Sequence, residues 1–477
     1  MSQSSIGRRD LLRLVGASGA SYLFGHAFAG CVGSPALPGL PMDPMGRWWL
    51  SDNYGPVPDE IEAFDLGIEG ALPPELSGTF FRNGANPATS ESLHWFTGDG
   101  MLHGVRLSAG RALWYRNRFV GTHALSSGMP DNLGANRGNT SIRAHADKLL
   151  ALYEVAVPHE IDPETLETVG EYDFGGALRR PMSAHPKIDP VTGEMFFIGY
   201  APFAPFLTYH VVDRSGALVR SIELDIDHSS MMHDFQITER WAVIFDLPIH
   251  FDTAQLAAGF PFRWAPEAGA RFGLVARDGS SSEVRWFEID LCFMFHSFNA
   301  FETADGRVVI EGCRLPTLWE DSIADASETP SPWRWELDPS TGRVTESRLF
   351  DGSADFPQID ARRAGREHGI AYSLRFDESG MRAIAQPNGI TKHDRRTGRT
   401  LAWMAPAGHQ PDEALFVPFG DAEDDGYVLS MIFDASRVQS YVGVFDATML
   451  ERGPIARVWM PRRVPFGFHG TWLPERA

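Results

Sequence analysis

Four histidines of this chain stand among apolar or small neighbours, although the sequence contains sixteen histidines in all. Neutral imidazoles are good ligands for borderline metals such as Fe(II), Zn(II) and Cu(II). Because the four are far apart in the sequence, their spacing leaves two interpretations open, a shared metal site or separate core histidines. The four candidates are His185, His233, His296 and His469. Seven others lie among polar or turn residues, and we expect them to be exposed: His94, His123, His145, His228, His368, His393 and His409.

Three acidic residues also occupy apolar surroundings in which a solvated carboxylate would be unusual. They are Glu154, Asp355 and Glu413. A metal-bound imidazole commonly donates its second N–H to a carboxylate, so the two sets of residues fit together. Taken singly, each acid is better explained as the polar end of a strand or as part of a turn, whereas three such acids beside four such histidines favour a shared site.

The elements that must bring these residues together are predicted to be β-hairpins. A turn pattern of Asp, often followed by Pro, then Thr or Ser and Gly recurs between strand-like segments. It is found at residues 162–165, 189–193, 213–216, 338–342 and 394–398. The Asp side chain caps such a turn and Gly takes the positive φ that closes it. Repeated antiparallel hairpins over this length predict an all-β protein built as a β-propeller, whose innermost strands face a central axis.

Three long connections are rich in Phe, Trp, Pro and Leu, which is unusual for solvated loops. They are Pro202–Phe206, His250–Glu267 and Pro316–Pro332. If they gather over one face of the propeller, they form an apolar tunnel for a hydrophobic small molecule. The alternative is that they pack on one another as a simple cap.

The charge balance argues against one class of partner. The formal net charge is -20 and the sequence pI is about 5.2. A strongly acidic chain is repelled by phosphate backbones, so we do not expect nucleic acid to be a partner.

The N-terminal residues 1–31 have the features of an export signal rather than of a folded element. Arg8-Arg9 precedes a mildly apolar run, as in twin-arginine signals, which direct folded proteins to the periplasm. Cys31 follows Phe28-Ala29-Gly30 and is either a lipid acceptor or incidental to a cleavage near Ala29. We therefore expect a signal in residues 1–31, an extended segment in 32–65 and one catalytic propeller in 66–477. Contact with a membrane, through the apolar loops or a lipid on Cys31, is kept as a further interpretation.

The two remaining cysteines are not expected to form a disulfide. If Asp305-Gly306 makes a two-residue hairpin turn, Cys313 lies opposite about Phe298 and not opposite Cys292.

Several segments together resemble the carotenoid cleavage oxygenase family, which includes apocarotenoid oxygenases, lignostilbene dioxygenases and the retinoid isomerase of the retinal pigment epithelium. The resemblance extends from about Leu72 to Pro474. Besides the four histidine segments, it rests on LSGTFFRNGANP (76–87), WFTGDGMLHG (95–104), Asn139-Thr140 and IDPETLET (161–168).

The resemblance implies a seven-bladed propeller, with a cap of long loops and short helices over an axial Fe(II) that the four histidines hold. It also implies that Glu154, Asp355 and Glu413 orient His233, His296 and His469 in that order. The family has glutamate where Asp355 stands here. Because aspartate is one methylene shorter, we expect either a bridging water to His296 or a closer backbone.

The implied activity is oxidative cleavage of a C=C bond in a carotenoid or apocarotenoid, with O2 as co-substrate and two carbonyl products. Lignostilbene-cleaving relatives hold a phenol with a tyrosine and a lysine, but the first lysine here is Lys148. Cleavage of a stilbene or phenylpropenoid is therefore the alternative substrate class. The sequence is also compatible with a non-catalytic propeller that binds a polyene or lipid, and with an isomerase that does not consume O2.

Overall fold

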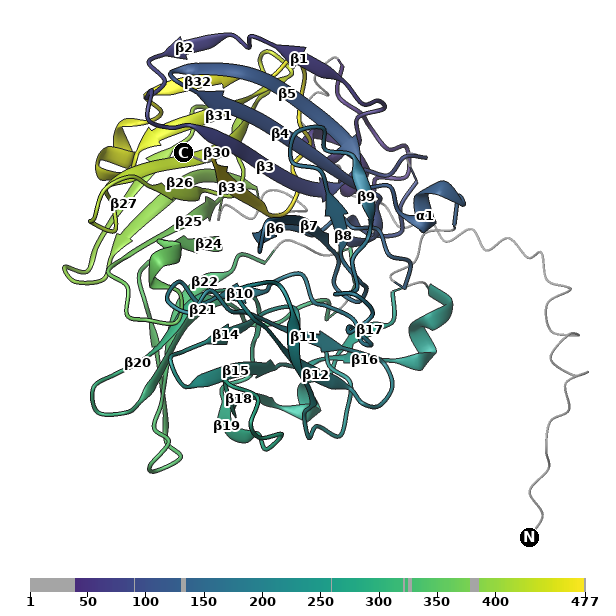
Figure 1. Ribbon diagram of the computed structural model, residues 1–477, viewed down its shortest axis with the longest axis vertical. Coiled ribbons are helices and arrows are strands. Elements are labelled where there is room, and N and C mark those ends of the chain that lie inside the picture. The colour runs from purple at the N-terminus through teal and green to yellow at the C-terminus, as the bar shows by residue number, and fades with distance from the viewer. Residues whose placement is uncertain are drawn as a thin grey trace, which may run out of the picture. The chain divides into compact units, whose positions relative to one another are not determined.

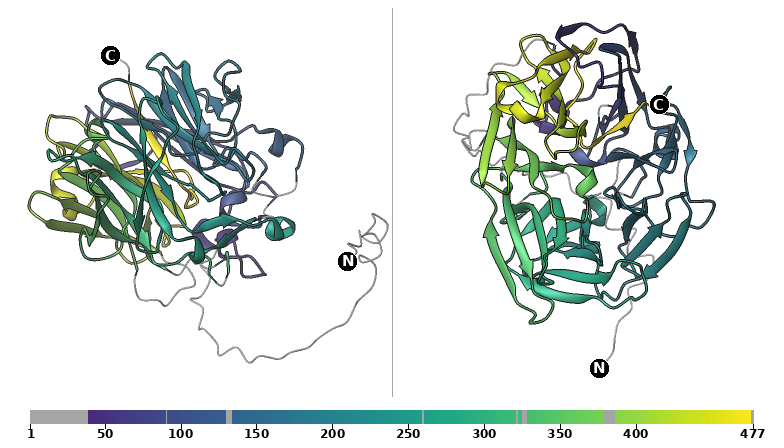
Figure 2. Two further views of the ribbon diagram at one scale, coloured as in Figure 1. Left: turned by 90° about the horizontal axis from the view of Figure 1, so that it is seen from below. Right: turned by 60° about the vertical axis from the view of Figure 1, so that its left-hand side comes forward.

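The computed structural model describes residues 39–89, 91–129, 134–258, 260–320, 322–324, 328–377 and 386–475. Seven antiparallel sheets of four or more strands are present in these residues, arranged as blades around an axis (Figures 1 and 2). The predicted all-β, seven-bladed propeller is confirmed. The signal expected in residues 1–31 lies outside the described residues.

The first four blades follow the chain from its N-terminal side. The first has the order β1-β5-β4-β3-β33, and the next three are simple meanders. The first blade contains β1 (Glu62–Phe64), β3 (Gly78–Ala85), β4 (Gly100–Ser108), β5 (Arg111–Phe119) and β33 (Gly470–Pro474). The second contains β6 (Ser141–His145), β7 (Lys148–Leu152), β8 (His159–Ile161) and β9 (Thr168–Glu171). The third contains β10 (Lys187–Ile188), β11 (Met195–Tyr200), β12 (Leu207–Val212) and β13 (Leu218–Glu223). The fourth contains β14 (Phe235–Ile237), β15 (Trp241–Asp246), β18 (Ala270–Ala276) and β19 (Arg285–Ile289).

The last three blades complete the ring. The fifth contains β20 (Phe293–Glu302), β21 (Val308–Leu315), β22 (Ser331–Leu337) and β23 (Val344–Arg348). The sixth contains β24 (Asp355–Ile359), β25 (Ile370–Phe376), β26 (Pro387–Asp394) and β27 (Arg399–Met404). The seventh contains β28 (His409–Pro411), β29 (Leu415–Pro418), β30 (Gly426–Asp434), β31 (Gln439–Asp446), β32 (Ala456–Trp459) and, at its outer edge, β2 (Ile68–Gly70).

In the third blade the middle strands are the most deeply buried. The strands β11 (MFFIGY) and β12 (LTYHVV) are buried at every position, whereas every position of the outermost strand β13 (LVRSIE) is exposed or half-buried. A strand covered on both faces by neighbouring blades must be apolar throughout, while an edge strand needs only one apolar face. The apolar core therefore lies between blades, around the middle strands.

The predicted Asp-led turns are confirmed between strands. Asp189 Oδ1 accepts hydrogen bonds from the backbone N–H of Val191 and of Thr192, and Gly193 has a φ of 73°. Asp338 Oδ1 accepts in the same way from Ser340 N and Thr341 N. These turns shape the hairpins, and so they set the position of the next innermost strand.

The ring closes by joining the two ends of the described chain. In Figure 1 the C-terminal strand β33 lies beside β3, and its register pairs Phe81 with Thr471 and Arg82 with Gly470. At the other joint, β2 pairs with β32, so that Ile68 faces Val458. The first blade thus holds the last strand, and the last blade holds one of the first.

Short helices and a small hairpin make up the remaining regular structure. The hairpin pairs β16 (Ile249–Phe251) with β17 (Phe262–Trp264), and one short α-helix, α1 (His123–Ser126), follows β5. The 3-10 helices are η2 (Trp48–Leu50), η3 (Asp52–Tyr54), η4 (Trp95–Thr97), η5 (Thr253–Ala258), η6 (Pro266–Ala268), η7 (Ala361–Arg363) and η8 (Ala447–Arg452). Across the described ranges, none of the helices has the length and apolar character needed to cross a membrane.

Cys292 and Cys313 are both free and buried, as the sequence analysis expected. The expected position of Cys313 opposite Phe298 is wrong: the register pairs Met294 with Arg314 and Ser297 with Gly312, so Cys313 lies opposite residues 295–296. Burial raises the pKa of Cys292 to about 12, so its thiol stays protonated at neutral pH.

Candidate metal centre

Every blade presents one residue of interest at or near the start of its innermost strand. In an antiparallel meander all innermost strands run in the same direction, so their starts meet at one end of the axis. The seven residues are Thr140 before β6, His185 before β10, His233 before β14, His296 in β20, Asp355 in β24, Glu413 before β29 and His469 before β33. Positions far apart in the sequence therefore become neighbours through the symmetry of the fold.

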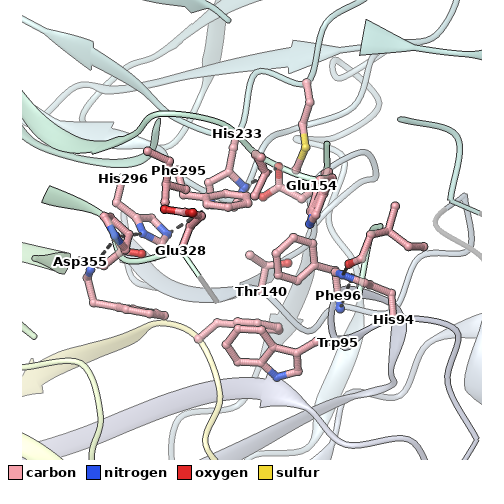
Figure 3. A pocket seen from close by; sticks show the side chains of 18 of the residues that line it. His94, Trp95, Phe96, Thr140, Glu154, His233, Phe295, His296, Glu328 and Asp355 are labelled. Carbon is pink, nitrogen blue, oxygen red and sulfur yellow. Dashed lines mark hydrogen bonds and ion pairs between the residues drawn. The ribbon is translucent and has the colours of Figure 1, made fainter. Parts of the chain in front are cut away.

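The four histidines meet at this end of the axis. Their ligand nitrogens all lie within 4.8 Å of one another, and all four side chains are buried. His185 Nε2 lies 2.9 Å from His233 Nε2, which in turn lies 3.3 Å from His296 Nε2. The ring centroids of His185 and His469 are 4.6 Å apart. Figure 3 shows His233 and His296 side by side at the wall of the cavity.

Three carboxylates contact the outer nitrogens of three of these rings. Asp355 Oδ1 lies 2.6 Å from His296 Nδ1, and Glu413 Oε1 lies 2.9 Å from His469 Nδ1. Since a carboxylate only accepts, each Nδ1 donates its proton and each Nε2 presents a lone pair to the centre. The three acids thus lie behind the histidines that the sequence analysis paired with them.

The third carboxylate contact is looser. Glu154 Oε2 lies 3.2 Å from His233 Nδ1 but accepts its better hydrogen bond, 2.9 Å long, from the Tyr200 hydroxyl. His233 Nδ1 and Glu154 Oε1 count among the buried polar atoms of the described residues that have no hydrogen-bond partner. The 3.2 Å contact between Glu154 and His233 is therefore close but poorly aligned for a hydrogen bond.

Asp355 reaches His296 directly, without a bridging water. Its strand β24 has a register irregularity between Asp355 and Gln358, and Phe356 adopts a positive φ of 50°. Such a bulge redirects a side chain locally and brings the shorter aspartate within hydrogen-bond distance. Of the two arrangements expected from the sequence, the structure contains the one with the closer backbone.

Burial keeps two of the four histidines, His185 and His469, uncharged. Burial, followed by the neighbouring imidazoles, lowers the pKa of His185 well below its usual value. Burial also lowers the pKa of His469 to about 4, although Glu413 acts in the opposite direction. Burial alone would raise the pKa of Glu413, but His469 and Arg143 lower it to about 2. His296 differs, because the Asp355 carboxylate outweighs burial and raises its pKa.

The donor set fits a transition-metal ion. The Nε2 atoms of His185, His233 and His296, taken in that order, lie 2.9 Å and 3.3 Å apart, close enough for one cation to be bound between them. Nitrogens that bind one metal ion through bonds of about 2.1 Å lie roughly 3 Å or slightly more apart, which matches these separations. The residues present thus provide four nitrogen ligands that suit a borderline metal.

An apolar cavity of about 280 Å³ leads to the histidines. Three aromatic side chains, Phe295, Phe96 and Trp95, stand close to the cluster (Figure 3). The ring centroid of Phe295 is 5.2 Å from His233, and that of Phe96 is 5.7 Å from Phe295. The remaining lining residues include Trp48, Tyr54, His94, Thr140, Tyr200, Leu315, Thr317, Leu318, Trp319, Glu320, Ile323, Glu328, Pro330, Phe376, Phe466 and Phe468.

The long apolar loops contribute unequally to this cavity. Residues of the Pro316–Pro332 connection form part of its wall, as the tunnel interpretation requires. No described residue of Pro202–Phe206 or of His250–Glu267 lines it, so for these two loops the expectation is wrong. Phe260 of the second loop instead packs behind the wall, with its centroid 4.9 Å from that of Trp319. Trp48 and Tyr54 line the cavity where these two loops were expected to do so.

Several histidines expected to be exposed are buried. His94, His368 and His393 are 3%, 1% and 3% exposed. His94 lines the cavity, and its Nδ1 accepts from Phe96 N at the start of η4. Polar neighbours in sequence did not predict exposure, because tertiary packing covers these rings: His368 lies 3.3 Å from the buried Glu311 carboxylate, and His393 stacks on Phe350.

Sequence reasoning did not assign Tyr200 or Thr140 to the site, although Thr140 belongs to a segment that carries the family resemblance. Tyr200 ends the ordinary apolar strand β11, and nothing in its sequence context marks its hydrogen bond to Glu154. Thr140 precedes β6 at the position where other blades carry a histidine or an acid. Only the equivalence of blades, which needs the strand boundaries, would have pointed to it.

Comparison with known proteins gives matches over nearly the whole described chain. The family model for the retinal pigment epithelial membrane protein matches residues 54–474. The carotenoid cleavage oxygenase of Mycobacterium tuberculosis is 32% identical over 89% of this chain and 97% of its own length. The isoeugenol monooxygenase of Pseudomonas nitroreducens is 30% identical over 88% of this chain and 97% of its own length.

Solved structures match equally broadly. The lignostilbene dioxygenase of Pseudomonas brassicacearum has a TM-score of 0.83 and 29% identity, covering 91% of this chain and 99% of its own. A cobalt-substituted apocarotenoid oxygenase of Synechocystis has a TM-score of 0.81 and 26% identity, covering 90% and 98%. The similarity therefore includes proteins named as carotenoid or apocarotenoid oxygenases as well as an isoeugenol monooxygenase and a lignostilbene dioxygenase.

Proposed function

The chain belongs to the family of carotenoid cleavage oxygenases and the retinal pigment epithelial membrane protein, and we propose that it is a non-haem Fe(II) dioxygenase that cleaves a C=C bond of a carotenoid or apocarotenoid. The observation that carries this proposal is the cluster of four buried imidazoles at the wall of an apolar cavity. In this proposal His185, His233, His296 and His469 hold the metal, and Glu154, Asp355 and Glu413 orient three of them.

Four neutral ligands leave the metal its full positive charge. When bound, Fe(II) in such a site supplies activation of O2 for attack on an electron-rich alkene, which yields two carbonyl products. The protein residues exclude water and position the double bond. Phe295 and Phe96 make the approach to the histidines apolar, and no side-chain nucleophile is required.

The lining of the cavity favours a neutral polyene over a phenolate. The described residues that line the cavity include Glu320 and Glu328 but no lysine or arginine. A phenolate or a carboxylate at the end of a substrate would meet negative charge without a compensating cation. We therefore regard substrates with neutral ends as the first candidates.

Cleavage of a stilbene or phenylpropenoid is the second candidate. It is favoured by the similarity to the Pseudomonas isoeugenol monooxygenase and lignostilbene dioxygenase. A neutral phenol held by hydrogen bonds to Glu328 or Thr317 would be compatible with the same lining.

Replacing His296 with alanine tests the catalytic proposal. Loss of one of four ligands is expected to lower iron affinity by more than about 100-fold, because even loss of an outer partner costs about 10- to 100-fold. Iron content is measured by mass spectrometry, and aldehyde products are measured with an apocarotenal and a hydroxystilbene in parallel. His123→Ala, which changes an exposed histidine in α1, is the matched control.

The outcomes distinguish the candidate functions. Aldehydes from the apocarotenal with one O2 consumed per turnover support polyene cleavage, and preferred turnover of the hydroxystilbene supports the second candidate. A polyene isomer formed without O2 consumption indicates an isomerase. Tight binding of a polyene by iron-free protein, with no turnover after iron loading, indicates a binding protein.

We also propose that the protein is exported to the periplasm by the twin-arginine route. Support comes from Arg8-Arg9 and the apolar run that follows, in residues outside the described part of the chain. This route carries folded proteins, so iron would be loaded in the cytoplasm before transport. Export should fail in Arg8→Lys/Arg9→Lys, and labelling with a radioactive fatty acid should show whether Cys31 is lipidated.

A further inference from the structure

A second cluster of metal-binding side chains lies outside the four-histidine centre. It consists of His228, Asp246 and His250, whose ligand atoms all lie within 4.8 Å of one another. None of the three lines the apolar cavity. The proposed oxygenase activity makes no use of them.

The backbone holds the three residues together at one end of the strands of the fourth blade. His228 belongs to the connection between β13 and β14, Asp246 ends β15, and His250 is the middle residue of β16. An isolated antiparallel bridge joins Ser230 to His250, and Phe251 N donates to Ser229 O over 3.1 Å. Two hydrogen-bonded segments therefore fix the separation of the two histidines.

The His228 ring stands between two carboxylates. Its Nδ1 lies 2.8 Å from Asp227 Oδ1, and its Nε2 lies 3.0 Å from Asp246 Oδ1. A neutral imidazole donates from only one nitrogen. One of the two contacts therefore places a nitrogen lone pair against a carboxylate lone pair, unless the ring carries a second proton or a metal ion lies between the two atoms. Either a second proton or a metal ion at Nε2 resolves this conflict. With Asp227 holding the Nδ1 proton, the ring has the carboxylate–histidine arrangement that is common behind metal ligands.

Asp246 is an anchored ligand with one oxygen directed at the cluster. Its side chain is only 4% exposed, whereas that of Asp227 is 93% exposed. Asp246 Oδ2 accepts from Arg271 Nε over 2.8 Å, and the Arg271 guanidinium lies 4.1 Å from the centre of the Trp286 ring. Ser230 Oγ donates to Asp246 Oδ1 over 2.8 Å. Arg271 thus fixes the carboxylate and leaves Oδ1 to face the two histidines.

His250 supplies the third donor. Its ring stacks on His228 with 4.6 Å between centroids and an angle of 21°. The His250 ring has no hydrogen-bond partner within the described ranges, and burial followed by the adjacent His228 lowers its pKa. A neutral imidazole with a free lone pair beside a carboxylate is suited to a divalent ion. Both histidines are half-buried, so an ion can reach them from solvent.

We propose that His228, Asp246 and His250 form a site for a divalent transition-metal ion of the zinc class, with solvent completing its coordination. Two imidazoles and one carboxylate are a typical ligand set for Zn²⁺, whereas Ca²⁺ and Mg²⁺ prefer oxygen ligands. This site differs from the four-histidine centre because it contains a carboxylate ligand and is open to solvent. An ion there would tie β16 to the connection that leads into His233, five residues after His228.

The experiment is a zinc titration of the iron-loaded full-length protein. Calorimetry is expected to show one equivalent of Zn²⁺ bound while the iron content, measured by mass spectrometry after buffer exchange, stays constant. Repeating the titration in two buffers of different ionisation enthalpy should reveal proton release, since Zn²⁺ displaces the second proton of His228. His228→Gln and His250→Gln should each weaken zinc binding by roughly tenfold or more.

Matched variants and a second ion make the result decisive. His123→Gln changes an exposed histidine elsewhere and should bind zinc like the wild type. Mg²⁺ in place of Zn²⁺ should give no binding heat. The proposal is overturned if the wild type takes up no zinc beyond its iron, or if both glutamine variants retain the wild-type zinc affinity with their iron content intact.

Discussion

The three carboxylates behind the histidines differ in how firmly the surrounding residues hold them. Glu413 accepts hydrogen bonds from His469 Nδ1, from Gly470 N over 2.7 Å and from Gln358 Nε2 over 2.9 Å. Among the described residues, Glu154 has only the Tyr200 hydroxyl as a well-aligned donor. A carboxylate that its own surroundings orient holds its histidine in the ligating tautomer before any metal arrives. We therefore expect the His469 ring to be the better fixed and the His233 ring the more mobile.

Asp355→Asn is the sharpest test at the scale of single residues. The amide keeps the shape of the side chain but removes the charge that holds the His296 Nδ1 proton over 2.6 Å. We expect iron affinity to fall by about 10- to 100-fold, with the fold unchanged. Metal affinity is measured by competition with a chelator, which does not depend on turnover. Asp305→Asn, in the exposed turn between β20 and β21, serves as the control.

An unchanged iron affinity in Asp355→Asn would contradict this role and leave Asp355 as an ordinary strand-end acid. The sequence was sufficient to select the three acids as candidates, because each stands within or directly before an apolar segment. The sequence did not predict the short distance between Asp355 and His296, because that distance depends on a bulge in β24 that composition does not reveal. Tyr200 was missed for a similar reason, since a tyrosine at the end of a buried strand is unremarkable until its hydroxyl has a partner.

Loops and short helices, and not the propeller strands, decide what reaches the histidines. The connection between β21 and β22 brings Glu320 and Glu328 to the cavity, and η2 and η3 bring Trp48 and Tyr54. Apolar composition predicted the first of these correctly. It failed for Pro202–Phe206 and His250–Glu267 because an apolar loop has two ways to bury its side chains, against a ligand cavity or against other loops. The choice depends on where the parent strands end in space.

Glu328→Lys tests the role of charge in the cavity lining. Reversing the charge of this exposed carboxylate should favour substrates that end in a carboxylate over the corresponding aldehydes. We expect the ratio of kcat/KM values for the acid and the aldehyde to rise roughly five- to tenfold, and to fall again as salt is added. Glu283→Lys, an equally exposed reversal before β19, is the control. An unaltered ratio would show that Glu328 is remote from the bound end of the substrate.

At the scale of the whole molecule, the metal centre and the closure of the ring depend on the same segment. His469 directly precedes β33, which pairs with β3 of the first blade, while its partner Glu413 comes from the seventh blade. The sequence predicted that His469 could join only in a closed ring, and the fold bears this out. The three-dimensional register was needed to show that β33 pairs with β3 and that β2 pairs with the last blade.

A buried ion pair stands beneath this closing segment. Arg82 of β3 pairs with Asp412, which lies between β28 and β29, and the two side chains are 2% and 4% exposed. Arg82 Nη1 also donates to Pro465 O over 3.4 Å, and Gly467 N donates to Asp412 Oδ2 over 3.5 Å. The pair thus connects the first blade, the last blade and the residues that lead to His469. Within the fold it is placed to couple ring closure to the position of the fourth histidine.

Asp412→Ala tests this coupling. The substitution leaves the Arg82 guanidinium buried without its counter-ion, and this should cost about 3–5 kcal/mol in the free energy of unfolding. Asp65→Ala, which removes the exposed partner of Arg111, should change that free energy little. Urea unfolding is followed by tryptophan fluorescence on both variants, together with iron content. If Asp412→Ala lost no more stability than Asp65→Ala and kept its iron, the closing segment would be held by the β3–β33 pairing alone. Loss of both stability and iron would show that the contact between the first and last blades also positions His469.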